Sequence, residues 1–223
     1  MEQILYYFFN WTLISPYLPE ILQGFWVTLQ MAVMTVVLGT ALGLALAVLR
    51  CYGWRPVNIL MTLYVDVFRA IPQLVIIVLV FFALPSVGIV IDPMPATVLA
   101  LSLVLSAFAE EIFWSGIAAV PTGQWEAGRS TGMGFSQTLF AIILPQAVRL
   151  AIPPLTNRAI GITKGTTLGS VIAVPELLNV SSNIQSTIAN PTAFTAGAFL
   201  FCLIFFPFVY LTRVLERRYA IKS

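Results

Sequence analysis

Long apolar runs alternate along this chain with short polar connections. The runs at 24–49 and 193–211 contain no charged residue. At a rise of about 1.5 Å per residue, helices of this length reach across a hydrocarbon core of about 30 Å. The pattern predicts five membrane-spanning segments, at 24–49, 57–83, 95–119, 144–175 and 193–211.

The fourth predicted span is irregular because prolines and glycines interrupt it. Backbone groups freed by such breaks must be buried in protein or face a water-filled path. The string Gly161-Ile162-Thr163-Lys164-Gly165-Thr166-Thr167 combines a flexible backbone with hydroxyl groups, which suits a broken-helix site for a small polar or zwitterionic solute. The string lacks the spacing of a phosphate-binding P-loop, so we expect no ATP hydrolysis by this chain.

The basic residues near the span ends follow the first, third and fifth spans or begin the fourth: they are Arg50, Arg55, Arg129, Arg149, Arg213, Arg217, Arg218 and Lys222. The other connections, 1–23, 84–94 and 176–192, contain acidic residues but no Lys or Arg. Cytoplasmic connections of membrane proteins are enriched in basic residues. The distribution therefore predicts an outer N-terminus and a cytoplasmic C-terminus.

The composition supports a membrane protein and excludes several other classes. Apolar residues make up 59% of the chain and charged residues 9%, against about 45–50% and about 25% in soluble domains. A net charge of +2 is too weak for nucleic-acid binding. The chain has no histidine, and Cys51 and Cys202 are far apart, which excludes a Cys/His zinc site and histidine-based catalysis. We interpret both cysteines as apolar fillers.

The N-terminus does not resemble a cleaved signal peptide, so the first span is expected to remain in the mature protein.

The second span carries two opposite charges on one helical face. Arg69 lies near its middle and Asp66 lies three residues earlier. A charge in the membrane centre costs at least about 2.5–3.5 kcal/mol, so these two residues form either an internal ion pair or a contact to the solute. Pro72 removes a backbone donor, which predicts a kink or an opening of the helix there.

The third span carries adjacent carboxylates, Glu110 and Glu111. Neighbouring helix positions point about 100° apart, so one site cannot use both. We expect one to pair with a basic residue and the other to face a lumen. The candidate residues of a substrate path are Asp66, Arg69, Gln73, Glu110, Glu111, Lys164, Thr166, Thr167 and Ser170. In the first span, Gly39 and Gly43 form a GxxxG pattern, which either lets another helix approach closely or is ordinary membrane-helix glycine.

The predicted cytoplasmic loop at 120–145 has a distinctive pattern. It indicates a short helix after a Pro/Gly turn, ended by Gly132 and Gly134, and a second short helix leading into Pro145. We expect Trp125, Met133 and Phe135 to be exposed, which would suit a hydrophobic groove on a partner protein. A loop lying on the membrane surface is the alternative.

This loop resembles the EAA loop of ABC-importer permeases, through Glu126-Ala127-Gly128, Gly132 and Ile143-Leu144-Pro145. From about residue 24 onwards the chain resembles the polar amino-acid permeases. The matching strings are Phe68-Arg69-Ala70-Ile71-Pro72, Val120-Pro121-Thr122-Gly123-Gln124, Leu144-Pro145-Gln146-Ala147-Val148-Arg149, Pro153-Pro154-Leu155-Thr156-Asn157 and Lys164-Gly165-Thr166-Thr167-Leu168. Departures from the usual family residues occur at Ala70, Ile71, Trp114, Ser115, Gly128 and Gly165, and Glu110 is an extra carboxylate.

The resemblance implies an all-α permease with the type I ABC-importer fold, formed by one domain over 1–223. Such a permease would pair with a second permease chain, identical or related, in the lipid bilayer of the bacterial inner membrane. It would work with a cytoplasmic ATPase dimer, which would bind ATP and Mg²⁺, and with a periplasmic or tethered solute-binding protein. The coupling residues would be Glu126, Ala127, Gly128, Gly132 and Pro145. The implied function is import of a polar amino acid or a related solute by alternating access.

Two other function classes fit the sequence less well. An ion-coupled secondary carrier could use Asp66, Glu110 and Glu111 as coupling carboxylates, but such carriers usually show repeated halves, and this chain has no internal repeat. An intramembrane hydrolase lacks support because the sequence has neither a histidine nor a GxSxG elbow.

Overall fold

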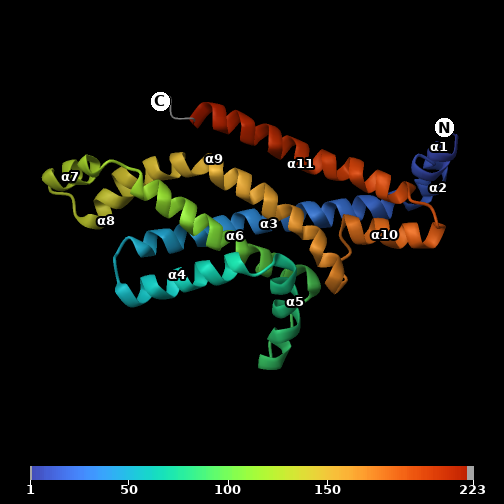
Figure 1. Ribbon diagram of the computed structural model, residues 1–223, viewed down its shortest axis with the longest axis horizontal. Coiled ribbons are helices and arrows are strands. Elements are labelled where there is room, and N and C mark those ends of the chain that lie inside the picture. The colour runs from blue at the N-terminus through green and yellow to red at the C-terminus, as the bar shows by residue number, and fades with distance from the viewer. Residues whose placement is uncertain (1, 220–223) are drawn as a thin grey trace.

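The computed structural model describes residues 2–219 and the side chains of residues 3–214, and this part of the chain is helical with no strand. Its long helices run along one axis, with the loop around α7 at one end and the N-terminal helices at the other (Figure 1). The long helices are α3 (Leu18–Arg50), α4 (Arg55–Ala70), α6 (Pro93–Ala118), α9 (Leu144–Thr163) and α11 (Thr192–Tyr219). The side chains of Glu2, Arg217, Arg218 and Lys222, used in the charge argument, lie outside the described residues.

The predicted number of spans is confirmed. Within the residues that the structure describes, four helical stretches are long and apolar enough to cross a membrane, and a bent helix pair supplies the fifth when counted as one span. The four are Gln3–Arg50, Pro93–Ala118, Phe135–Ile172 and Thr192–Val214. The N-terminal helices lie at one end of the long axis, and α11 runs from there toward the α7 end (Figure 1).

The second span is bent much more sharply than a kink. Helix α4 ends at Ala70 and α5 (Gln73–Ala83) begins after Pro72, with 109° between the two axes. Ile71 and Pro72 adopt extended backbone conformations, with ψ of 133° and 139°. Since proline disfavours helical geometry in the residue before it, Pro72 explains the break. Helix α5 and the short η2 (Leu84–Val87) thus leave the bundle axis (Figure 1).

The fourth span is irregular, as predicted, but continuous with the loop before it. Helix α8 (Phe135–Thr138) passes through η3 (Leu139–Ile143), a π-helical stretch, directly into α9. Pro153 and Pro154 lie inside α9 without ending it. The span then tightens into η4 (Lys164–Ile172), a 3₁₀ helix, which ends at Ala173 in a left-handed conformation.

A further helix, α10 (Leu177–Ile188), occupies the predicted external connection at 176–192 and was missed by the sequence pattern. The Glu176 carboxylate accepts hydrogen bonds from the backbone N–H groups of Leu178 and Asn179 and so caps this helix. Burial raises the pKa of the Glu176 carboxyl to about 7, although these two hydrogen bonds favour the charged form. The Leu177 N–H donates to Thr28 Oγ1 at 3.0 Å, which fixes α10 against α3.

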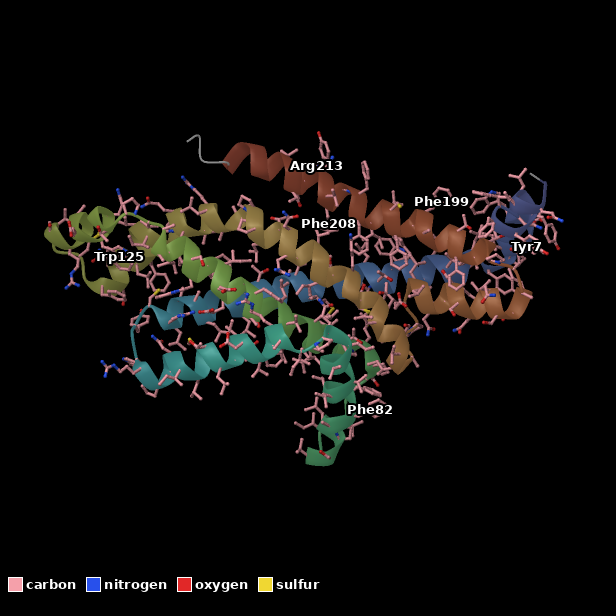
Figure 2. All side chains as sticks on the ribbon, viewed as in Figure 1. Tyr7, Phe82, Trp125, Phe199, Phe208 and Arg213 are labelled. Atoms are coloured by element: carbon pink, nitrogen blue, oxygen red, sulfur yellow. The ribbon has the colours of Figure 1, made fainter. Side chains whose placement is uncertain are left out.

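The N-terminal helices are attached to the start of α11. These are α1 (Glu2–Phe8), α2 (Trp11–Ile14) and η1 (Ser15–Tyr17). Asn190 Nδ2 donates to the Tyr6 carbonyl and Thr192 Oγ1 to the Tyr7 carbonyl. Figure 2 shows Tyr7 at the end of the molecule opposite Trp125.

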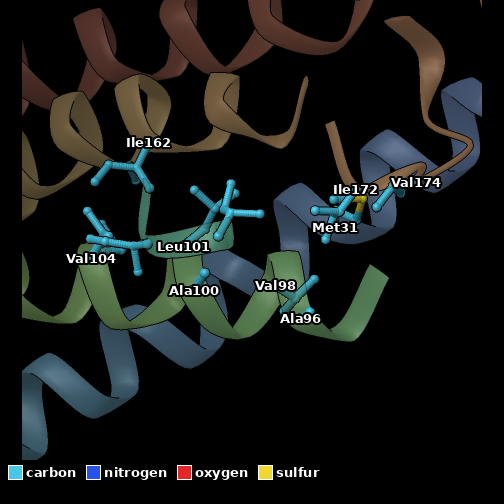
Figure 3. Close-up of a cluster of buried hydrophobic side chains, with 13 residues drawn as sticks. Met31, Ala96, Val98, Ala100, Leu101, Val104, Ile162, Ile172 and Val174 are labelled. Carbon is cyan, nitrogen blue, oxygen red and sulfur yellow. The ribbon is translucent and has the colours of Figure 1, made fainter. Parts of the chain in front are cut away.

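Helix α6 lies at the centre of the bundle and contacts α3, α4, α5 and α9. In the middle of the molecule, Leu101 and Val104 of α6 pack toward Ile162 of α9, while Met31 of α3 lies beside Ile172 (Figure 3). Two smaller apolar clusters lie toward the ends of the bundle, one around Phe113 and one around Leu177. Burial of apolar side chains between helices thus continues along the whole bundle.

Candidate functional site

Arg69 pairs with Glu111 of α6 and not with Asp66. Its Nη1 lies 2.5 Å from Glu111 Oε2, whereas Asp66 is exposed and forms no ion pair within the described part of the chain. Of the two alternatives for Asp66 and Arg69, the internal ion pair is therefore wrong, and contact of either residue with the solute stays a prediction. Position on one helical face brought the two residues near each other, but the long Arg69 side chain reaches the neighbouring helix.

A second arginine, Arg158, contacts the same aromatic ring as Arg69. The guanidinium carbon of Arg158 lies 4.0 Å from the centroid of the Phe108 ring, and that of Arg69 lies 5.3 Å from it. Both distances allow a cation–π interaction. Arg158 and Phe108 were missed as site residues, because their relation depends on how α6 and α9 pack. We call Arg69, Phe108, Glu111 and Arg158 the arginine–aromatic cluster.

A hollow of about 430 Å³ opens beside this cluster, between α6 and α9. Its lining includes Glu111, Ser115, Leu150 and Pro154. The exposed fractions of the Arg69 and Glu111 side chains are 36% and 45%, so both groups can reach a ligand. A carboxylate, two guanidinium groups and an aromatic face together can bind a small molecule that carries both a carboxylate and an ammonium group.

Glu110 lies in a different environment from Glu111. It is completely buried, and its Oε1 accepts a hydrogen bond of 2.9 Å from Arg50 Nη1. The Arg50 guanidinium also lies over the Trp114 ring, 4.6 Å from its centroid. The prediction that one glutamate pairs with a basic residue is confirmed, and in fact both do. Glu110 thus lies in the contact between α3 and α6, away from the hollow.

The hydroxyl groups near Lys164 bond locally. Thr166, Thr167 and Ser170 each donate to a backbone carbonyl three residues earlier. Thr166 is fully buried and Lys164 is exposed. Their role in a substrate path remains a prediction.

Gln73, at the start of α5, faces Gly165 in η4. A Cβ atom at Gly165 would collide with Gln73 Oε1 and would touch Leu101. A side chain at Gly165 would therefore require the flexible end of Gln73 to move. Gln73 of α5 thus lies against the 3₁₀ segment of the fourth span.

The loop at 120–145 forms the helices that its sequence predicts. Helix α7 (Thr122–Ser130) ends in a turn with Gly132 at φ +85°, where the Met133 N–H donates to the Gly128 carbonyl and the Gly132 N–H to the Arg129 carbonyl. This is the hydrogen-bond pattern of a Schellman C-cap, which favours glycine. Gly132 therefore ends the helix as expected.

The loop aromatics stabilise the loop from within. The Trp125 and Phe135 rings stack with centroids 5.3 Å apart, and Tyr52 packs edge-on against Phe135. Trp125, Met133 and Phe135 are only partly exposed, so the expectation of exposed aromatic anchors is wrong. The rings instead cover the buried cluster around Phe113. Figure 2 shows Trp125 at the α7 end of the molecule.

Small residues let α7 lie directly on the start of the fourth span. Gly128 is buried, and a Cβ atom there would come within 2.7 Å of Thr138 Cγ2 and 3.0 Å of Ile142 Cδ1. Glu126, Ala127 and Pro145 are exposed. The loop thus presents Glu126 and Ala127 on a helix that is packed through Gly128 onto the α8–α9 segment.

The family described as binding-protein-dependent transport system inner membrane component matches residues 39–221. The chain belongs to this family. Permeases of this family act with ATPase subunits, a substrate-binding protein and a second permease. The permease is thus a multi-pass membrane protein and a transport component rather than an enzyme. Nothing in this match supports the ion-coupled carrier.

Curated relatives and solved structures agree with this assignment. The L-cystine transport system permease protein TcyB of Bacillus subtilis (strain 168) is 35% identical, over 93% of this chain and 90% of its own. The probable glutamine ABC transporter permease protein GlnP of the same strain is 37% identical, over 90% and 92%. A chain in the crystal structure of an amino acid ABC transporter with histidines is 30% identical, with a TM-score of 0.81 over 92% of this chain and 96% of that chain. A chain of the MetNI methionine ABC transporter, at 22% identity and a TM-score of 0.72, has the same fold.

Proposed function

We propose that this permease imports a polar amino acid or a closely related solute across the bacterial inner membrane, and that ATPase subunits on the cytoplasmic side drive the transport. The arginine–aromatic cluster is the observation that carries the choice of solute. Its carboxylate suits the ammonium group of an amino acid, and its guanidinium groups suit the carboxylate. The names of the amino-acid permeases to which the chain is similar support the same class.

Exposed charges in the membrane-spanning segments support a position for a second permease chain. Asp66, Arg69, Arg158 and Lys164 are exposed in segments that cross the membrane. Charges at that depth require a partner, a cavity or a water-filled path. We propose that a second chain, identical or related, faces the exposed side of α4, α6 and α9 and encloses the path. A periplasmic or tethered binding protein would deliver the solute to the outer end.

The first prediction concerns Arg158. In proteoliposomes that contain the assembled importer, Arg158→Ala is expected to weaken solute uptake about 10- to 100-fold, because a charge-assisted hydrogen bond contributes about 1.5–3 kcal/mol. Arg158→Lys should keep part of the uptake. The control is Arg149→Ala, which removes another exposed cation of α9. Uptake as in the unmodified importer for Arg158→Ala, at equal protein content, would remove Arg158 from the path.

The second prediction concerns the coupling loop. Gly132→Trp is expected to abolish uptake while ATP hydrolysis continues, because the loop would no longer seat on the ATPase subunits. Gly53→Trp is a matched control, because Gly53 also has a positive φ, of +72°, and open space around it, but lies outside the loop. If both substitutions reduce the coupling of hydrolysis to uptake equally, backbone strain explains the effect and the docking role of 120–145 is refuted.

A further inference from the structure

The turn that follows α3 contacts the loop at 120–145 through the side chain of Tyr52. The Tyr52 ring packs edge-on against Phe135 of α8, with the ring centroids 5.5 Å apart. The Tyr52 hydroxyl lies within hydrogen-bond distance of Ser136 Oγ, at 3.1 Å. Phe135 in turn stacks on Trp125 of α7, with the centroids 5.3 Å apart. Three rings thus form a continuous series from the end of the first span to α7.

The same turn also contacts the third span. Arg50, two residues before Tyr52, forms the ion pair with the buried Glu110 of α6. The backbone N–H groups of Cys51 and Tyr52 donate to carbonyls in the last turn of α3, which keeps positions 50 and 52 in a fixed relation. Helices α3 and α6 pack closely, most tightly at Gly43. The end of α3 therefore connects the loop to a closely packed pair of spans.

An unfilled space lies beside the Phe135 ring. This hollow of about 260 Å³ lies between the loop and the ends of α3 and α6, and its lining includes Cys51, Trp114, Trp125 and Phe135. Helices α7 and α8 pack on each other and on η3, which leads into the fourth span. The loop is thus packed directly onto the fourth span. It reaches the end of the first span beside a hollow, where the Tyr52 ring extends to Phe135.

We propose that Tyr52 is a positioning residue for the coupling of ATP hydrolysis to transport. Through Phe135 it keeps Trp125 and α7 in one orientation relative to the first and third spans. A movement of the loop then reaches these two spans as well as the fourth. This role rests on the proposed function, in which ATPase subunits act on the loop, and it assigns a part in coupling to a residue outside that loop.

The test is the number of ATP molecules hydrolysed per solute molecule taken up, measured in proteoliposomes at equal content of the assembled importer. Tyr52→Leu should raise this ratio about 2- to 10-fold, because an aromatic pair contributes about 0.5–1.5 kcal/mol. Tyr52→Phe keeps the ring and should keep the ratio, since the hydrogen bond of the hydroxyl is exposed and contributes little. The matched control is Trp54→Leu, which removes an exposed ring from the same connection and should leave the ratio unchanged.

A purely structural effect of the substitution gives a different result. Loss of folded permease lowers uptake and hydrolysis together, so an unchanged ratio for Tyr52→Leu overturns the proposal. The double variant Tyr52→Leu/Phe135→Leu tests whether Tyr52 acts through Phe135. If it does, the double variant has the ratio of Phe135→Leu alone, whereas independent residues would have additive effects on the logarithm of the ratio. Additive effects would therefore refute the role of Tyr52 as a positioning residue.

A second measurement uses the unmodified importer and requires no variant to fold. The hollow gives a small thiol reagent access to the half-buried Cys51. If Tyr52 holds the loop to the end of α3, the two move together and the surroundings of Cys51 stay the same. The rate of Cys51 alkylation by iodoacetamide, followed by mass spectrometry, should therefore be equal in the nucleotide-free and ATP-trapped states. A changed rate would show that the loop moves past the end of α3, against the proposal.

Failure of this proposal and failure of the coupling loop give different results. If Gly132→Trp uncouples hydrolysis from uptake and Tyr52→Leu does not, the loop couples the two activities but Tyr52 does not position it. If neither substitution changes the ratio, the docking role of the loop is refuted as well.

Discussion

Arg50→Met is expected to destabilise the permease by about 3–5 kcal/mol, the cost of breaking a buried ion pair by removing one partner. Glu110 is completely buried, and Arg50 supplies its 2.9 Å ion-pair contact. In the described structure its second oxygen, Oε2, has no hydrogen-bond partner. The variant therefore leaves a carboxylate in an apolar contact between α3 and α6 with nothing to balance its charge. The expected result is a much lower melting temperature in detergent and little accumulation in the membrane.

The double variant Arg50→Met/Glu110→Leu provides the decisive comparison. Replacing a buried ion pair by apolar residues of similar volume is often neutral or stabilising. The double variant should therefore recover most of the stability that either single variant loses, and a double-mutant cycle on melting temperature measures the coupling. Arg55→Met is the control, because Arg55 is exposed in the same connection. Equal losses from Arg50→Met and Arg55→Met would show that the pair contributes no stability.

Uptake by the double variant tests whether the Arg50–Glu110 pair acts only in helix packing. Glu110 was a candidate for the substrate path, and it lies in the contact between α3 and α6. If the double variant folds and still transports, Glu110 is a packing residue. If it folds but does not transport, the carboxylate has a role in the transport cycle that its burial alone does not explain.

The sequence predicts the spans well because apolar length and the absence of charge are local properties. The uncharged run at 24–49 and the helix α3 agree closely, and the break at Pro72 follows from the geometry of proline. The external helix α10 was missed because its polar residues resemble a loop. It is formed by contacts that no local pattern contains, including the Leu177 hydrogen bond to Thr28 across 149 positions.

The site was less predictable because it depends on which helices are neighbours. Arg69 and Asp66 share a face of α4, but the nearest carboxylate for Arg69 comes from α6. The sequence around Arg158 did not mark it as a site residue, because only the packing of α9 on α6 places it over Phe108. In the loop, Gly132 and Gly134 were predicted to end the first helix, and the helix does end in the turn at Gly132. The inward stacking of Trp125 on Phe135 could not be derived from their sequence positions.

After Arg50→Met, Gly43→Leu is expected to reduce the stability of the permease most, because α3 and α6 touch at this position. Even a Cβ atom at Gly43 would come within 2.5 Å of Ala109 Cβ, 2.8 Å of the Ser106 carbonyl oxygen and 2.9 Å of the Glu110 nitrogen. Two of these atoms belong to the backbone and cannot rotate away. Overpacking of a tight core costs about 1–3 kcal/mol, and the rigid neighbours place this site at or above the upper end.

The matched control is Ala41→Leu, which adds a similar volume to an exposed position of the same helix. Membrane content and melting temperature in detergent should fall for Gly43→Leu and stay near those of the unmodified permease for Ala41→Leu. Ala109→Gly should rescue Gly43→Ala only in part, because it removes one close atom and leaves the two backbone atoms in place. Full rescue would show that the helices can separate easily, and it would make the GxxxG pattern of α3 ordinary membrane-helix glycine.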